Sequence, residues 1–313
     1  EGMREAKESS VARLVPSASL GAGSIQFDDN TLQPWTLTTA QINAFLLTAG
    51  GVTNPVIDVN SAVVSLFSAA ATKYPVNDPR IGDRRNTGGH RFNAPVPVTQ
   101  NMHTARFDWN MTSDQKHVVS FRGNYQQDLT GAAAWLPDTP PTNFWSHPLG
   151  LAATHTWLLS SNMTNRFSYG LTRLAYSSQG DSSDPSITFR SVFSPRAFAR
   201  GVNRTNPTQN FTDDFTWIKG NHTLQFGTNI RLIANTRENF ATSFDSAITN
   251  FSWSPTNIAS TAIGQYLTAQ VGSPRSVQSS WRTNVQHALV ALFGRLNDYT
   301  ANVNYNLAGQ ILP

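Results

Sequence analysis

The sequence contains no cysteine, which excludes a disulfide scaffold and any cysteine-based metal or redox site. Charge is also scarce: charged residues make up 13% of the chain, about half of the roughly 25% that is usual in soluble proteins. Hydrophobic residues make up only 39%, so neutral polar residues take the place of the missing charges. A run of 18 apolar residues is absent too, so the sequence predicts no transmembrane helix.

Basic clusters are missing as well. The formal net charge is +4, and no run of five Lys or Arg occurs, which argues against nucleic acid as a partner. The chain begins EGMREAKESS, with neither an initiator Met nor the apolar stretch of a signal peptide. We interpret it as a fragment or a processed form, so the lack of a signal does not indicate the cytoplasm.

What the chain does have is period-two alternation of apolar and polar residues. Three hairpins show it, over residues 104–126, 151–172 and 214–232, with turns predicted at 112–116, 161–164 and 219–221. Such alternation, interrupted by Gly, Asn, Asp and Ser, is typical of β-strands with one apolar face. The apolar face could pack into a soluble core or face lipid, and alternation alone does not distinguish the two.

The lengths of the connections favour lipid. Each hairpin closes in three to five residues, whereas the links 128–150 and 177–209 between hairpins are much longer. Outer-membrane barrels have short periplasmic turns and long extracellular loops. The sequence therefore predicts an all-β fold: a partial, open segment of an antiparallel transmembrane β-barrel, with roughly eight strands. Ten side chains are expected to face lipid: Phe107, Trp109, Phe121, Tyr125, Trp157, Phe167, Tyr169, Trp217, Leu224 and Phe226.

The two ends of the chain follow other patterns. Residues 38–50 and 56–75 have helical spacing, with Asn60 or Ser61 as the N-cap of the second helix, and 76–100 is predicted to be loop. We therefore divide the chain into 1–100, a barrel-associated loop region with two short helices, and 101–313, the hairpins of an incomplete barrel. Near the C-terminus, 246–253 and 301–309 are predicted strands and 260–270 a short helix, and 287–296 fits either strand or helix.

Four stretches in order resemble a known family. They are EGMRE with LVPSASLGAGSIQF, VIDVNSAVVSLFSAAATKYPVND, NMHTARFDWNMTSDQKHVVSFRGNY and KGNHTLQFGTNIRLI. Together they are similar to the large TonB-dependent outer-membrane receptors, in particular the Oar-like branch with a carboxypeptidase-regulatory-like domain. Each motif alone is little more than a strand pattern, and the segment LFGRLNDYTANVNYN departs from the family pattern.

The resemblance implies a location and partners. It implies the outer membrane of a Gram-negative bacterium, contact with outer-membrane lipid, and import of a scarce extracellular nutrient whose identity stays unknown. It also implies coupling to a TonB complex through a plug and a TonB box, which we expect to lie in regions missing from this chain. The family barrel has 22 strands, so the chain would form part of its wall.

No enzymatic motif is recognisable in the sequence. GxSxG, P-loop, GxGxxG, HExxH and EF-hand patterns are absent, and the seven His are scattered. We therefore expect no enzyme activity, no catalytic or metal-binding residues, and no cofactor. Four arginines that fall on the predicted long link could contact lipopolysaccharide or substrate, although side chains that are simply solvated explain them better: Arg190, Arg196, Arg200 and Arg204.

Two functions from different classes remain open. The first is energy-coupled transport by a TonB-dependent receptor. The alternative is a secreted all-β module that binds carbohydrate or a surface partner. A passive porin, without any plug, is a third possibility.

Overall fold

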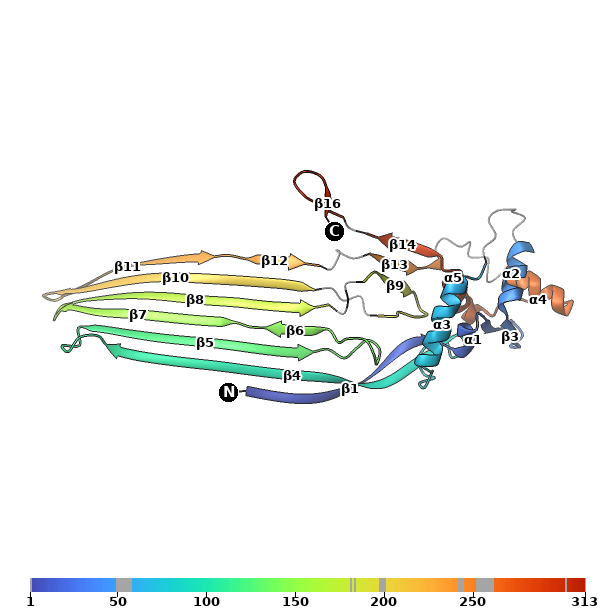
Figure 1. The fold of residues 1–313 in the computed structure, drawn as a ribbon, viewed down its shortest axis with the longest axis horizontal. Coiled ribbons are helices and arrows are strands. Elements are labelled where there is room, and N and C mark those ends of the chain that lie inside the picture. Colours follow the sequence, from blue (N-terminus) through green and yellow to red (C-terminus); the bar gives the residue numbers. More distant parts are fainter. Residues whose placement is uncertain are drawn as a thin grey trace.

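One long antiparallel sheet dominates the computed structural model (Figure 1), which describes residues 2–48, 58–180, 182, 184–196, 201–240, 245–251, 262–301 and 303–312. Seven strand positions follow one another across it. Two positions hold two consecutive segments, because β6 and β7 both lie between β5 and β8, and β11 and β12 both pair with β10. The strands are β1 (Gly2–Pro16), β4 (Thr87–Asn110), β5 (His117–Gly131), β6 (Asn143–Ser146), β7 (Leu149–Ser160), β8 (Met163–Gln179), β10 (Val202–Lys219), β11 (His222–Ile233) and β12 (Thr236–Asn239).

The three predicted hairpins are confirmed, as β4–β5, β7–β8 and β10–β11. Their turns all lie at one end of the sheet, which is the left end in Figure 1. The turn between β10 and β11 joins Lys219 to His222 through Gly220, whose φ of 60° is accessible to glycine without strain. We call this end the hairpin end.

At the opposite end the longer connections fold into a compact body, which we call the loop-end region. It contains α1 (Ala18–Gly21), β2 (Ile25–Asp28), β3 (Pro34–Leu37), α2 (Thr39–Thr48), α3 (Ser61–Lys73), β9 (Ser186–Phe189), β13 (Ser246–Thr249), α4 (Ile263–Val271), η3 (Ser279–Trp281), α5 (Arg282–Phe293) and β14 (Leu296–Thr300). Strands β9, β13 and β14 form a small sheet, and β2 pairs with β3. A short hairpin, β15 (Asn304–Tyr305) with β16 (Ile311–Leu312), follows.

The hydrophobic core lies in the loop-end region. Fully buried side chains from distant parts of the sequence meet there, among them Phe27, Phe67, Phe189 and Leu289. The rings of Phe67 and Phe189 pack edge to face, with 4.8 Å between centroids. The body is therefore held together by apolar packing between segments more than a hundred residues apart.

The predicted loop over 76–100 is wrong from Thr87 onwards, where β4 begins, so β4 also runs through residue 100, our predicted domain boundary. Pro95 and Pro97 suggested a loop because proline donates no ladder hydrogen bond. The amides of Gly89 and Arg91 point to the edge of β4 away from β1, and alternation puts Pro95 and Pro97 on that same edge. Pairing with β5 begins only at Val98, so neither proline interrupts a ladder.

Other elements refine or correct the predictions. Residues 2–16, which fall in the predicted loop region, form strand β1. The link predicted over 177–209 is shorter than expected, because β8 reaches Gln179 and β10 starts at Val202. The run 287–296 is helical up to Phe293, because α5 is buried from Val285 to Phe293 and a helix buried all round has no polar face. The strand predicted over 301–309 is confined to β15.

The helices near the N-terminus and α4 match their predicted positions. Asn60 caps α3, since its Oδ1 accepts hydrogen bonds from the amides of Ala62 at 2.9 Å and Val63 at 3.4 Å. α2 and α4 lie within the predicted ranges to within one residue. Residues 49 and 50 at the end of the first predicted helix lie outside the described residues, as do residues 252 and 253 of the predicted strand 246–253.

Candidate functional site

The register of the sheet assigns each side chain to one of two faces. Residues directly opposite one another in an antiparallel ladder share a face, so one row can be followed across six strand positions. That row consists of Phe107, Phe121, Ala153, Tyr169, Phe211 and Ile230. Side chains two residues away along each strand lie on the same face. We call this the apolar face.

All ten residues predicted to face lipid lie on the apolar face. Eight of them are exposed, with Phe107 at 68% and Trp109 and Phe226 at 61% the most accessible, and Tyr169 and Trp217 are half-buried. Soluble proteins rarely expose so many large apolar side chains on one contiguous surface. Contact of these side chains with lipid remains a prediction.

The opposite face carries most of the charge. Arg106, Arg122, Arg166, Arg231, Asp108 and Asp214 all lie there. Arg106 and Asp108 form an ion pair on it, with 2.8 Å between Nε and Oδ2. Alternation of apolar and charged residues along one strand is the pattern of a wall between lipid and a hydrated interior.

Tryptophans mark the hairpin end of the apolar face. Trp109, Trp157 and Trp217 each lie within three residues of the end of a strand. Trp157 opposes Asn165, and Arg173, eight residues further along β8, is on the same face. Those eight residues span about 27 Å along the strand, or about 21 Å across a membrane at a tilt near 40°. The apolar face therefore has the height expected of a membrane-spanning band, about 25 Å.

Polar groups interrupt the apolar face at two places that sequence spacing did not reveal. His117 Nδ1 lies 3.1 Å from His155 Nε2, and the two rings are stacked. Asn165 Nδ2 donates to Asp213 Oδ1 at 2.9 Å. Both pairs join residues on adjacent strands, far apart in sequence, so only the register brings them together.

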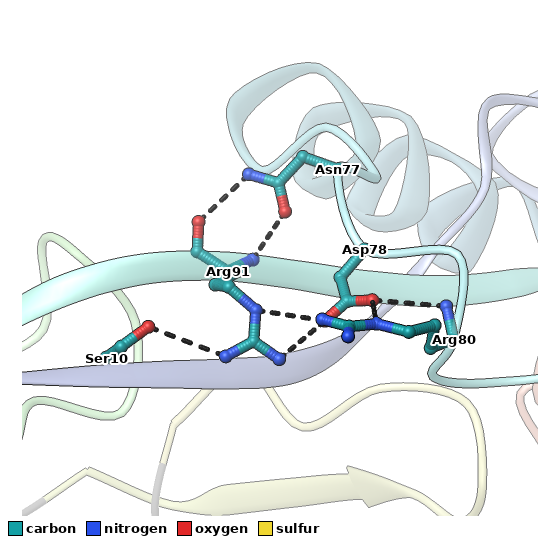
Figure 2. Close-up of polar contacts among 5 residues, drawn as sticks. All are labelled: Ser10, Asn77, Asp78, Arg80 and Arg91. Carbon is teal, nitrogen blue, oxygen red and sulfur yellow. Dashed lines mark hydrogen bonds and ion pairs between the residues drawn. The ribbon is translucent and has the colours of Figure 1, made fainter.

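The loop-end region is fixed to the sheet by the segment that precedes β4 (Figure 2). Asn77 binds the backbone of Arg91 on both sides: its Nδ2 donates to the Arg91 carbonyl at 2.9 Å, and its Oδ1 accepts from the Arg91 amide at 2.6 Å. Asp78 and Gly89 also exchange backbone hydrogen bonds. The segment thereby covers the edge of β4 that β5 does not reach, which is how sheets avoid edge-to-edge pairing.

Asp78 is the charged centre of this attachment (Figure 2). Its carboxylate is 3% exposed and accepts from Nε of Arg80 and Nε of Arg91, both at 2.9 Å. Hydrogen bonds from Arg80 and then Arg91 hold the pKa of Asp78 far below its usual range. Gly89 allows the close approach, because a Cβ there would lie 2.9 Å from the Asp78 carbonyl oxygen.

A second carboxylate organises the turn between β2 and β3. Asp29 is fully buried, and it accepts from the Thr31 hydroxyl at 2.7 Å and the Trp35 indole at 3.0 Å. Burial alone would raise its pKa, but these bonds, with the Thr31 and Gln33 amides, lower the pKa of Asp29 from 3.8 to about 2. Arg275 Nε, 3.4 Å away, ties this turn to the segment after α4.

The structure describes three of the four arginines predicted as loop contacts, and they lie in different surroundings. Arg204 lies within β10, so its assignment to a loop is wrong, because the strand starts two residues earlier. Arg196 is ion-paired with Asp184 at 2.8 Å, Arg190 is exposed after β9, and Arg200 lies outside the described residues.

Neither a metal site nor a membrane-spanning helix is found in the described ranges. In those ranges no group of three or more His, Asp or Glu side chains is arranged to hold a metal ion. No helix among them has the length and apolarity needed to cross a membrane.

The fold and its two faces define a segment of transmembrane β-barrel wall, with a folded body on the longer connections. A family model for an outer membrane beta barrel domain matches residues 1–294. The chain therefore belongs to the outer membrane beta barrel domain family, and its location is the outer membrane of a Gram-negative bacterium. No curated protein and no solved structure matches it.

Proposed function

We propose that the chain is part of the barrel wall of a TonB-dependent receptor of the Oar-like type, which imports a scarce nutrient by energy-coupled transport. The carrying observation is the openness of the sheet. β1 and β11 end the order of seven positions without pairing with each other in the described chain, as expected if this sheet is one part of a wider barrel. Eight strands suffice for a small closed barrel, whereas receptors of this class use 22.

The charged face and the loop-end region support the same proposal. A wide barrel presents a polar interior and large extracellular loops. Here the polar face carries several arginines, among them Arg106, Arg122, Arg166 and Arg231, and the connections fold into an ordered body that could meet a substrate before it enters. In this proposal the partners are outer-membrane lipid, an unidentified extracellular substrate and a TonB complex that acts through a plug. The protein has no enzymatic role.

Membership of an outer-membrane family argues against the secreted carbohydrate-binding module, so the passive porin is the competing function. Competitive growth of strains with and without the full-length gene, in media limited for one nutrient at a time, would separate the two. The receptor proposal predicts a growth disadvantage in at least one medium. That disadvantage should disappear when both strains lack the energy-coupling protein. A disadvantage that persists without coupling would identify a passive pore.

A further inference from the structure

A cationic site lies at the outer margin of the apolar face, where β6 passes into β7. Trp145 opposes Ser177, and Leu149 opposes Arg173. The two positions are four residues apart in number on both sides, with three residues between them, so His147 lies midway on the same face. Its amide donates to the Ala175 carbonyl. Trp145, His147 and Arg173 thus form one patch on the apolar face.

The patch lies at the expected boundary of the hydrocarbon layer, at the edge of the apolar face nearer the loop-end region. Arg173 is about 21 Å above the tryptophan end at a strand tilt near 40°. Between these levels, the apolar face of the described strands β4 to β11 carries no Lys or Arg. Arg173 is therefore the first cation that the face presents on the side of the loop-end region.

Two polar atoms of the patch, one on Arg173 and one on His147, make no hydrogen bond in the described chain. No carboxylate there lies within ion-pair distance of Arg173, whose Nη2 donates to the His147 carbonyl at 3.3 Å while its Nε is buried and makes no hydrogen bond. His147 Nδ1 is buried and unbonded as well. The indole of Trp145 stacks on His147, with 4.0 Å between ring centroids. Asp128 pairs with Ser146, the neighbour of His147, so it lies at the same height along the sheet. The register nevertheless places its carboxylate on the opposite face.

We propose that Trp145, His147 and Arg173 bind the phosphate of an outer-leaflet lipopolysaccharide. An arginine guanidinium binds phosphate in a bidentate geometry, and tryptophan prefers the boundary between hydrocarbon and headgroups. The site rests on the proposed orientation, in which the loop-end region is outside the cell. A phosphate at this level would supply the negative charge that the described residues do not provide to Arg173.

The test uses the full-length protein purified from outer membranes, with lipopolysaccharide as the probe. Arg173→Gln should lower binding of lipopolysaccharide by about tenfold or more, because a charge-assisted hydrogen bond is lost. Arg166→Gln is the matched control, since Arg166 lies on the same strand but on the polar face, and binding should be unchanged. Arg173→Lys should recover part of the affinity. Protease resistance of each variant shows whether the barrel has folded.

Three further probes distinguish the phosphate of lipopolysaccharide from other sources of phosphate. Dephosphorylated lipopolysaccharide should bind wild type as weakly as intact lipopolysaccharide binds Arg173→Gln. Arg173-dependent binding of inorganic phosphate alone, or preference for phosphatidylglycerol vesicles over lipopolysaccharide, would overturn the proposal. Equal losses in Arg173→Gln and Arg166→Gln would overturn it too. The growth assay for energy-coupled import is independent of all these outcomes, so failure of one proposal is distinguishable from failure of the other.

Discussion

At the scale of single residues, substitutions at two consecutive positions of a strand should differ sharply in their effect on folding, because the two side chains lie on opposite faces of the sheet. Phe121 lies on the apolar face and Arg122 on the polar face of β5. Phe121→Arg should weaken folding into lipid by about 2–4 kcal/mol if the position is near mid-membrane, whereas Arg122→Ala should have little effect. Urea titration of folding into liposomes measures both. Equal effects of the two substitutions would contradict the assignment of faces.

Asp213 is a carboxylate on the apolar face, between Phe211 and Phe215. Because a carboxylate facing hydrocarbon is unfavourable, Asp213→Val should stabilise the protein in liposomes by about 1–2 kcal/mol. Asp214→Val, on the polar face, is the matched control and should bring no gain. Destabilisation by Asp213→Val would mean that the hydrogen bond from Asn165 outweighs the cost of a carboxylate on this face.

Asp29 predicts acid sensitivity of the loop-end region. Its folded pKa of about 2 lies below the unfolded value of 3.8, so its contribution to stability is present above pH 4 and is lost as pH falls towards 2. Asp29→Asn should lower stability at neutral pH and remove this part of the pH dependence. Protease cleavage within the loop-end region, measured from pH 6 to pH 2, gives both quantities. An unchanged pH profile in Asp29→Asn would exclude this role.

At the scale of elements, the two ends of the sheet should lie on opposite sides of the outer membrane. Ser65 is exposed on α3 in the loop-end region, and Ser113 is exposed in the turn between β4 and β5. The chain has no cysteine of its own, so Ser65→Cys and Ser113→Cys each provide one reactive thiol. On intact cells an impermeant maleimide should label the first and not the second. The reverse pattern would invert the topology.

The hairpins could be predicted because a strand with one apolar face shows period-two alternation of apolar and polar residues in its sequence. β11 matches the predicted range, and Asn60 caps its helix as expected. The start of β4 could not be predicted, since the edge on which a proline lies depends on pairing with distant strands. Neither could the pairs His117–His155 and Asn165–Asp213, nor the patch at Arg173, because all three depend on register.

At the scale of the whole molecule, residues 1–313 alone should not form a uniform pore. The sheet has an edge at β1 and another at β11 in the described chain, and unpaired backbone groups do not persist in hydrocarbon. Single-channel recordings of the purified 313-residue chain in a planar bilayer should show no stable conductance. Uniform conductance would identify a complete small porin and would end the receptor proposal.

The length of β4 has a consequence for what can reach this protein from outside. From His103, opposite Tyr125, the strand continues through 16 residues to Thr87, about 54 Å along the chain. In the proposed orientation, with the loop-end region outside the cell, a strand of this length tilted by about 40° would carry that region about 40 Å away from the lipid. Helices α3 and α5 would then stand within or beyond the sugar coat of the cell. Antibodies and phage tail fibres would meet that folded body first, long before they approached the barrel mouth.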